Sequence, residues 1–470
     1  MTGRPIPARP LLLLAAVAVS YANAFRGAFQ FDDFNVIVEN PVVHSFAAFL
    51  RDLPNGIRPL LKLSYLINWT AGGGPFGFHL VNVLLHAANT LLVYRLALWA
   101  VEGEDTAGVP GRGTVPFLAA FLFAVHPVQT EAVTYVSGRS MSMMAFFYLG
   151  SLFAYVRGAD GGKGWRYVAS PLLFACAVLT KETAVTLPAA LVLWEAAFGK
   201  GKGSLREIAR RQAPHWALLL FFAAALAFHS TYRELLLYGF GARGVEDNLL
   251  TQVNGIAYLL SRLVRIDALN IDPDLPVHVS WSPVLLGEAG ILAGSFLLGA
   301  VLLWRRSAAG FGLLWFFLQI LPTNSVIPRL DVANERHLYL ASWGIFLAAG
   351  EAGRFARASL PGKERWLSAS AYAAAVVLVL FTVSRNGVYR SEVTLWKETA
   401  RLSAGKARVH NNLGFAYHLE GEPDRAIPAY RRALRIDPGF RLARGNLARA
   451  EAEIARRGIP VPFAGSRRFP

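Results

Sequence analysis

Two adjacent carboxylates, Asp32 and Asp33, stand between phenylalanines in the segment AFQFDDFNVIVENP, directly after the first apolar run of the chain. A carboxylate can act as a general base that removes a proton from an attacking hydroxyl group. Two neighbouring carboxylates repel each other, which raises the pKa of one of them toward the range useful for this chemistry. Alternatively, the pair holds a divalent cation. From the residues alone, either aspartate can be the base.

More ionisable side chains occur beside apolar runs, in the segments FAVHPVQTEAVTYVSGRS, LTKETA and PRLDVANERHLYL. A charged residue at a helix end can simply reach the lipid headgroups. Taken together, however, these side chains fall near one leaflet, and ionisable residues beside membrane helices are candidates for function. They predict a polar cavity that opens outward, and they are His126, Glu131, Arg139, Lys181, Glu182, Asp331, Glu335, Arg336 and His337.

A second polar pattern lies within the apolar segment GFHLVNVLLHAANT. His79, Asn82, His86 and Asn89 follow one another at spacings of 3, 4 and 3 residues, which places them on one face of a helix. Such a stripe either belongs to the polar cavity or forms hydrogen bonds between neighbouring helices.

The overall composition indicates a polytopic membrane protein. The chain has 470 residues, of which 54% are hydrophobic and only 17% charged, and its mean hydropathy of +0.37 is too high for an ordinary soluble protein. The formal charge of +16 would favour a nucleic-acid partner only if the basic residues gathered on one soluble face. They do not, so no nucleic-acid partner is expected.

Apolar runs predict about eleven transmembrane helices, although several runs are shorter than the ~20 residues that span a bilayer. We interpret the first run as an uncleaved helix rather than a signal peptide, because so many others follow it. The runs lie at about 11–23, 78–100, 114–125, 141–156, 167–180, 184–199, 214–229, 284–304, 309–321, 337–350 and 367–383.

The distribution of basic residues predicts the orientation of these helices. With the N-terminus in the cytoplasm, the basic segments FGKGKGSLREIARRQAP and GRFARASLPGKER fall inside, as the positive-inside rule requires. Asp32 and Asp33 then lie outside, in a long first loop at about 24–77. Within that loop, GIRPLLKLSYLINW has the apolar spacing of an amphipathic helix on the membrane surface.

The polar tail from residue 384 contains a tetratricopeptide-like repeat at 407–440, with incomplete repeats on both sides. The pattern predicts a helix–turn–helix in which Pro438 ends the second helix. The matching residues are Leu413, Gly414, Tyr417, Ala426, Tyr430, Ala433 and Pro438.

A polar cavity that contains cations and an acidic pair suits the transfer of a group from a lipid phosphate. Cationic side chains can hold a phosphate and stabilise the charge that develops on it as it leaves. A carboxylate can take the proton of the attacking hydroxyl.

The ordered blocks FQFDDFNVIVENP, RPLLKLSYLINW, GFHLVNVLLHAANTLL, FAVHPVQTEAVTYVSGRS, LTKETAVTLPA and ERHLYLAS resemble the transmembrane and tetratricopeptide-repeat-containing O-mannosyltransferases, and the wider C-type glycosyltransferase fold. The resemblance spans nearly the whole chain. It implies an all-α fold with a membrane glycosyltransferase domain at 1–383 and an extracytoplasmic repeat region at 384–470.

The resemblance also implies an inverting transfer of a sugar, mannose, from a polyprenyl-phosphate donor to Ser or Thr of a protein on the outer face. Asp32 and Asp33 would carry base catalysis, with no certain cofactor. Arg58, Arg139, Lys181 and Arg336 are the candidates for the donor phosphate. The supporting candidates are His79, His126, Glu131, Glu182 and His337.

Two other functions stay open. Family members usually carry a longer repeat array, so the acceptor can instead be a lipid or a cell-envelope glycan. A membrane scaffold whose repeat recruits a protein partner is the third hypothesis, but it leaves the acidic pair unexplained. The high Ala, Arg and Gly content favours a bacterial chain in the inner membrane, with the site facing the periplasm.

Overall fold

The structure is a computed structural model that describes residues 8–102, 113–199 and 204–457. Every regular element in these residues is a helix, which confirms the predicted all-α class. The chain separates into two compact units. The first comprises the residues up to Leu269 together with Leu275–Tyr389, and the second comprises Asn270–Asp274 and the residues from Arg390 onward.

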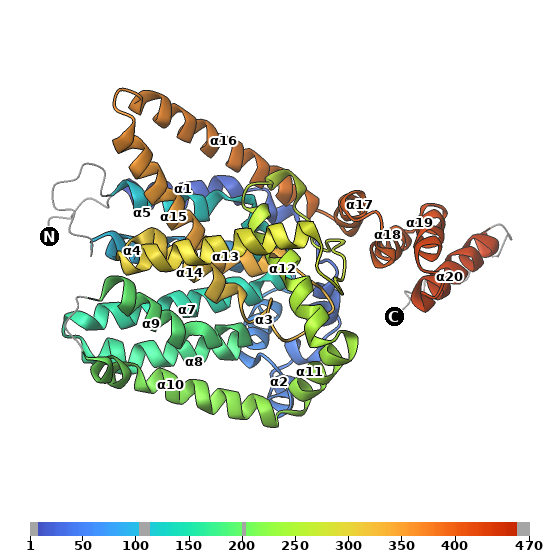
Figure 1. Ribbon diagram of the computed structural model, residues 1–470. Helices are drawn as coiled ribbons and strands as arrows, with labels where there is room; N and C mark the ends of the chain where they lie inside the picture. Colours follow the sequence, from blue (N-terminus) through green and yellow to red (C-terminus); the bar gives the residue numbers. More distant parts are fainter. Residues whose placement is uncertain (1–7, 103–112, 200–203, 458–470) are drawn as a thin grey trace. The chain divides into compact units, whose positions relative to one another are not determined.

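Long helices and short connections make up the first unit, and Figure 1 shows α7, α8, α9 and α10 side by side. The helices of this unit are α1 (Ala8–Tyr21), α2 (Phe46–Asp52), α3 (Pro59–Thr70), α4 (Pro75–Glu102), α5 (Thr114–Val125), α6 (Thr130–Val133), α7 (Arg139–Arg157), α8 (Ser170–Thr180), α9 (Leu187–Phe198), α10 (Leu205–Phe228), α11 (Ser230–Ala242), α12 (Val245–Arg262), α13 (Pro283–Trp304), α14 (Ala308–Ile320), α15 (Leu338–Ser359) and α16 (Glu364–Val388).

Among the described residues, four helical segments are long and apolar enough to cross a membrane: Ala8–Arg26, Pro75–Val101, Pro283–Trp304 and Glu364–Val388. The number rises to six if each of two bent pairs, Thr114–Val125 with Pro127–Val133 and Arg206–Phe228 with Ser230–Ala242, forms one span.

The prediction of about eleven transmembrane helices is therefore wrong, although these apolar helices do indicate a membrane protein. Several predicted runs form helices that are too short, since α8, α9 and α14 have 11, 12 and 13 residues and a span needs ~20. Part of the basic segment predicted to lie inside, residues 200–203, falls outside the described residues.

Helices α14 and α15 touch through their backbones at two glycines. A Cβ atom added to Gly312 would lie 2.1 Å from the carbonyl oxygen of Gly344, and one added to Gly344 would lie 2.1 Å from the carbonyl oxygen of Gly312. Beside this contact the rings of Trp315 and Trp343 pack edge to face, with centroids 4.7 Å apart. Small residues allow apolar helices to approach this closely.

Replacing Gly312 by valine is expected to lower the stability of the first unit by about 1–3 kcal/mol, because the added side chain forces the two helices apart. The measurement is thermal unfolding of the purified protein in detergent. Gly294→Val is the matched control, since a Cβ atom at Gly294 of α13 has no neighbour within 4 Å. Equal shifts of the unfolding temperature in both variants would show that the close contact between α14 and α15 at Gly312 does not matter for stability.

The polar stripe of α4 forms hydrogen bonds to several other segments. All four side chains are buried, so their bonds hold the helix in place where water is excluded. The partners are the carbonyl oxygen of Gly27 for His79 (3.2 Å), that of Val133 for Asn82 (3.2 Å), the hydroxyl of Tyr339 for His86 (2.9 Å), and the carbonyl oxygen of Ser142 for Asn89 (2.8 Å).

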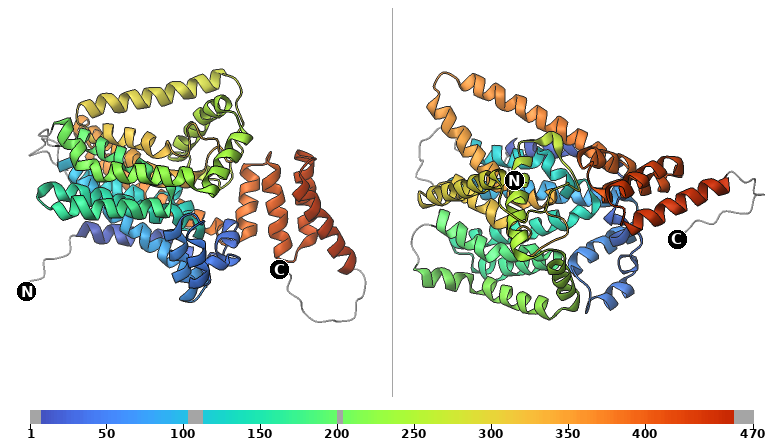
Figure 2. Two further views of the ribbon diagram at one scale, coloured as in Figure 1. Left: turned by 90° about the horizontal axis from the view of Figure 1, so that it is seen from below. Right: turned by 45° about the vertical axis from the view of Figure 1, so that its right-hand side comes forward.

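The second unit contains α17 (Glu392–Leu402), α18 (Ala407–Leu419), α19 (Pro423–Ile436) and α20 (Arg441–Arg457), which stand side by side in Figure 2. Helices α18 and α19 form the predicted helix–turn–helix, and α19 ends two residues before Pro438. Their shared core includes Tyr417 and Tyr430.

A separate stretch of chain, Asn270–Asp274, completes the second unit. The buried carboxylate of Asp272 accepts hydrogen bonds from Lys406 Nζ (2.5 Å) and from Arg408 Nε and Nη2 (2.9 and 2.6 Å). The hydroxyl of Ser403 donates to the Asp272 carbonyl oxygen at 2.8 Å. The repeat unit is thus built from two separate parts of the sequence. The shorter part, Asn270–Asp274, is held to the helices by hydrogen bonds between Asp272 and basic side chains.

Candidate functional site

Asp33 is a fully buried anchor for the acidic segment. It precedes the short helix η2 (Phe34–Val38). Its Oδ2 atom accepts a hydrogen bond from the backbone N–H of Gln30 at 2.9 Å. Its Oδ1 atom accepts from the backbone N–H of Ser137 at 2.8 Å and from the Ser137 hydroxyl. Asp33 therefore ties the first loop to the segment VSGR, which lies 104 residues further along the chain.

Asp32 is more accessible to solvent than Asp33. Its side chain is half-buried rather than fully buried, and its backbone N–H donates to the hydroxyl of Tyr135 at 2.9 Å. Phe31, which precedes it, has φ of 47°, a left-handed conformation that costs a non-glycine residue roughly 1–3 kcal/mol. The surrounding bonds of Gln30, Asp32 and Asp33 hold this turn in place. A strained turn fixed in this way presents one carboxylate and buries the other.

Burial raises the pKa of Asp33 to about 7, although the hydrogen bonds from Ser137 and Gln30 oppose this shift. A carboxyl group with a raised pKa binds its proton more tightly in the folded than in the unfolded protein. Its contribution to stability is therefore complete below about pH 4 and is lost as the pH rises through about 7.

The protein is accordingly expected to unfold at a higher temperature at pH 5 than at pH 8, and Asp33→Asn should flatten this difference because an amide does not titrate. Thermal unfolding in detergent across this range measures the effect. Asp52→Asn is the control, since Asp52 forms a partly exposed ion pair with Lys62. A pH profile that Asp33→Asn leaves unchanged would exclude this residue as its source.

Arg58, the residue before α3, and Glu182 of η8 (Glu182–Thr186) form a bidentate ion pair. Arg58 Nε lies 3.0 Å from Glu182 Oε2, and Arg58 Nη2 lies 2.6 Å from Oε1. Burial opposes ionisation of Glu182, but the guanidinium of Arg58 outweighs it and lowers the pKa of Glu182 to about 2. The pair is thus charged at neutral pH, with both side chains about a quarter exposed.

Lys181 carries a buried amine that forms no ion pair with the residues that the structure describes. Its side chain is 4% exposed, and its Nζ atom makes one long hydrogen bond, of 3.4 Å, to the hydroxyl of Ser140. No ion pair within the described part of the chain includes it. Burial, followed by the positive charges of Arg58 and Arg336, holds the pKa of Lys181 well below its usual range. An unpaired buried amine is costly, so an anionic ligand would relieve the cost.

Arg336 pairs with Glu131 at the short helix η10 (Glu335–His337). The backbone N–H of Arg336 donates to Glu131 Oε2 at 3.0 Å, and its side-chain Nε lies 3.8 Å from Glu131 Oε1. Neither this Nε nor this Oε1 has a hydrogen-bond partner in the described structure. Tyr135 lies within electrostatic reach of Arg336 and of both aspartates, which brings the acidic pair and the cations into one neighbourhood.

Arg139 has a different environment from the other predicted phosphate ligands. It is fully buried and its guanidinium donates to Asn82 Oδ1 at 2.8 Å and to the Phe78 carbonyl oxygen at 3.0 Å. It also lies over the Tyr65 ring, 4.9 Å from the centroid. These contacts join α3, α4 and α7, so Arg139 has a structural role. Contact of Arg139 with a phosphate stays a prediction.

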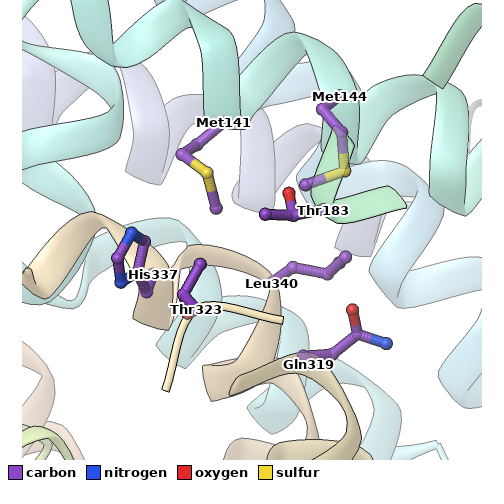
Figure 3. A pocket seen from close by; sticks show the side chains of 7 residues that line it. All are labelled: Met141, Met144, Thr183, Gln319, Thr323, His337 and Leu340. Atoms are coloured by element: carbon purple, nitrogen blue, oxygen red, sulfur yellow. The ribbon is translucent and has the colours of Figure 1, made fainter. Parts of the chain in front are cut away.

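The predicted histidines lie in two kinds of environment. His79 and His126 bond to the backbone, His79 to Gly27 and His126 to the Leu263 carbonyl oxygen at 3.1 Å. His337 instead lines a cavity of about 10 Å³, roughly the space that one water molecule needs. Figure 3 shows two methionines of α7 on one side of it and His337, Thr323 and Gln319 on the other. The complete lining is Met141, Met144, Thr183, Gln319, Thr323, His337 and Leu340.

Sequence inspection overlooked three residues of this region. Ser137 and Tyr135 hold the acidic pair. The half-buried Arg329 interacts electrostatically with the carboxylates of Glu182 and Asp331 and with the cations Arg58 and Arg336. The segment PRLDVANERHLYL contains Arg329, but nothing in its sequence distinguishes this arginine. No group of three or more His, Cys, Asp or Glu side chains suited to a metal ion occurs in the described residues.

Comparison with known proteins gives consistent matches. Residues 407–440 match the tetratricopeptide repeat family model, which confirms the predicted repeat. The chain is 28% identical to Protein O-mannosyl-transferase Tmtc3 of Drosophila melanogaster, over 95% of this chain and 58% of that protein. It is 25% identical to the human Protein O-mannosyl-transferase TMTC3, over 95% of this chain and 53% of that protein.

A shorter match, to Protein O-mannosyl-transferase TMTC1 of Mus musculus, is 34% identical and covers 39% of this chain and 21% of that protein. The chain thus spans about half the length of the curated relatives that it matches over most of its own length. No solved structure is detectably similar to it. Over 95% of its length, the chain is thus similar to proteins named Protein O-mannosyl-transferase, and it contains a tetratricopeptide repeat.

Proposed function

We propose that this protein is a membrane glycosyltransferase that moves a sugar, mannose, from a polyprenyl-phosphate donor to Ser or Thr hydroxyls of proteins. The observation that carries the proposal is the buried amine of Lys181, which forms no ion pair within the described residues and directly precedes Glu182 of the Arg58–Glu182 pair. The names of the relatives support the sugar and the acceptor class. The proposal places the site on the extracytoplasmic face, which for a bacterial chain is the periplasmic side of the inner membrane.

The donor phosphate is bound by Lys181 together with Arg58 and Arg336. An ammonium group supplies a point charge, and guanidinium groups supply paired donors that match phosphate oxygens. Glu182 holds the Arg58 side chain through the bidentate ion pair, and Glu131 fixes the backbone of Arg336 by accepting its N–H. Arg139, with its donors directed at the scaffold, supports α3 and α4 behind the site.

Asp32 is the general base and Asp33 is the positioning residue. Both oxygens of Asp33 are engaged by Gln30 and Ser137, and no part of it is exposed. Asp32 is partly accessible on the same fixed turn. The acceptor hydroxyl oxygen attacks the anomeric carbon while its proton passes to Asp32. The bond from the anomeric carbon to the phosphate oxygen breaks, its electron pair stays on that oxygen, and polyprenyl phosphate leaves with inversion at the carbon.

The test uses the purified full chain in lipid nanodiscs with radiolabelled polyprenyl-phosphomannose and a periplasmic protein extract. Label is expected in protein and should be released by alkaline β-elimination, which cleaves sugars linked to Ser or Thr. Label that enters only lipid or glycan would support transfer to the alternative acceptor class. Absence of transfer from mannose and from every other hexose donor would overturn the assignment as an enzyme and favour a membrane scaffold.

A further inference from the structure

The cavity that Figure 3 shows has a mixed lining from α7, η8, α14 and the segment of η10 and α15. Two methionines and a leucine form its apolar part, and four side chains are polar. Its volume of about 10 Å³ is the space that one hydroxyl group or one water molecule fills. Apolar walls with a few placed polar groups are typical of a site that binds a small group in one orientation.

Two of the four polar side chains in the lining are already hydrogen-bonded within the protein. Gln319 donates to the hydroxyl of Tyr148 at 2.8 Å and accepts from the hydroxyl of Thr186 at 3.3 Å. The hydroxyl of Thr323 donates to Asn324 Oδ1 at 2.9 Å. The bonds of Gln319 join α7, η8 and α14, so they fix the walls of the cavity in position.

The other two polar side chains each have an atom without a hydrogen-bond partner in the described structure. These atoms are Thr183 Oγ1 and His337 Nδ1, and both residues are only 8% exposed. A buried polar atom without a partner costs free energy that a bound group can recover. Because a hydroxyl group can accept one hydrogen bond and donate another, a single hydroxyl in this cavity can bond to both atoms.

The cavity adjoins the residues proposed to bind the donor phosphate. Thr183 comes two residues after Lys181, so their Cα atoms lie within roughly 7 Å of each other. The hydroxyl of Ser140 accepts a hydrogen bond from Lys181 Nζ at 3.4 Å, and Ser140 directly precedes the first methionine of the lining. A sugar bonded to a phosphate keeps its hydroxyls within about one ring's width of that phosphate. The group that suits the cavity is therefore part of the sugar.

We propose that this cavity receives one hydroxyl group of the donor sugar, and that Thr183 and His337 select for it. This inference rests on the proposed function. With the hydroxyl present, both side chains gain a hydrogen bond, whereas a sugar that lacks it leaves both buried without a partner. A site built to bond a substrate hydroxyl rejects the analogue without it far more strongly than an apolar pocket rejects an added group. The two residues thus determine sugar specificity.

The test measures binding of farnesyl phosphomannose and its 2-, 3-, 4- and 6-deoxy analogues to the full chain in nanodiscs, by calorimetry. One analogue is expected to bind about 10- to 100-fold more weakly than the mannose compound, the cost of leaving buried polar groups unpaired. Thr183→Val, which keeps the shape of the side chain, should reduce this discrimination by about 3- to 10-fold, the effect of one neutral hydrogen bond. The ratios for the other three analogues should stay as in the wild type.

Two further substitutions separate hydrogen bonding from packing. Thr180→Val is the matched control, because the buried hydroxyl of Thr180 already donates to the Cys176 carbonyl oxygen at 2.8 Å, and it should keep wild-type selectivity. His337→Asn retains a polar atom near the position of Nδ1 and should preserve the discrimination, whereas His337→Leu should reduce it.

The inference would be overturned if all four analogues bound alike to the wild type, a result that means the cavity holds only water. It would also be overturned if Thr183→Val and Thr180→Val changed the selectivity equally, which marks a structural effect. Transfer of mannose to protein tests the proposed function separately. Selective binding without any transfer would leave the inference standing and overturn the proposed function, and transfer with unchanged selectivity in Thr183→Val would do the reverse.

Discussion

Replacing Asp32 by asparagine is expected to lower kcat for sugar transfer by about 10²- to 10⁴-fold, the range that a general base contributes. Asparagine keeps the shape of the side chain but cannot accept the proton of the acceptor hydroxyl. Binding of the donor should change little, because the proposed phosphate ligands are Lys181 and the neighbouring arginines. The measurement is steady-state transfer in nanodiscs, together with the rise of the unfolding temperature that farnesyl phosphate produces.

Asp33→Asn provides the comparison. An asparagine oxygen can still accept the bonds from Ser137, but its amide would meet the backbone N–H of Gln30, a donor facing a donor. The turn that presents Asp32 should loosen, so we expect a smaller loss of kcat and a changed unfolding temperature. Full loss of transfer in Asp33→Asn, together with an active Asp32→Asn, would reverse the two roles.

The sequence predicted the acidic pair and most of the cations because their residue types are unusual beside apolar runs. Lys181 and Glu182 stand out for this reason in LTKETA. The repeat at 407–440 was also predictable, since its pattern is local and depends only on spacing within 34 residues. Features of this kind need no knowledge of the tertiary structure.

Other features depend on partners that are distant in sequence. Arg139 looks like a phosphate ligand in VSGRS, but its acceptors Asn82 and Phe78 lie about 60 residues earlier on α4. The different roles of Asp32 and Asp33 depend on Ser137 in the same way. Arg329 has no distinguishing pattern of its own, and the segment that carries it is held by bonds from Asn248 and to Gln252 of α12.

The number of spans could not be predicted because hydropathy does not record where a helix breaks. The apolar run before His126 ends in a bend of 52°, and the helix pair on either side of His229 is bent by 76°. For the polar stripe from His79 to Asn89, the sequence pattern likewise does not reveal the bonding partners. Its spacing indicated one helical face, and only the structure shows that the face forms hydrogen bonds to other segments.

Lys181→Met is expected to have opposite effects on stability and on binding. Methionine fills nearly the same volume without a polar group, so the unliganded protein should become more stable by roughly 1–3 kcal/mol, the cost of a buried polar group that lacks good partners. Binding of farnesyl phosphate should weaken by about 10- to 100-fold, because a charged hydrogen bond to the phosphate is lost. Thermal unfolding with and without this ligand measures both quantities.

Lys62→Met is the matched control. Lys62 donates to Asp52 at 2.5 Å, so its removal leaves a carboxylate without its partner and should lower stability slightly, with no effect on ligand binding. Opposite signs of the stability change in the two variants would show that Lys181 lacks an anionic partner in the unliganded protein, whereas Lys62 is already paired with Asp52. A Lys181→Met variant that is destabilised like Lys62→Met, yet binds farnesyl phosphate normally, would contradict the donor site.

The pKa of Lys181 adds a second measurement. Because burial holds this pKa well below its usual range, the amine is more easily neutral without a ligand than an exposed lysine. A bound phosphate favours the ammonium form, so binding should be accompanied by uptake of a proton. Calorimetric titrations of farnesyl phosphate in buffers of different ionisation enthalpy should detect this proton in the wild type, and its disappearance in Lys181→Met would identify Lys181 as the group that receives it.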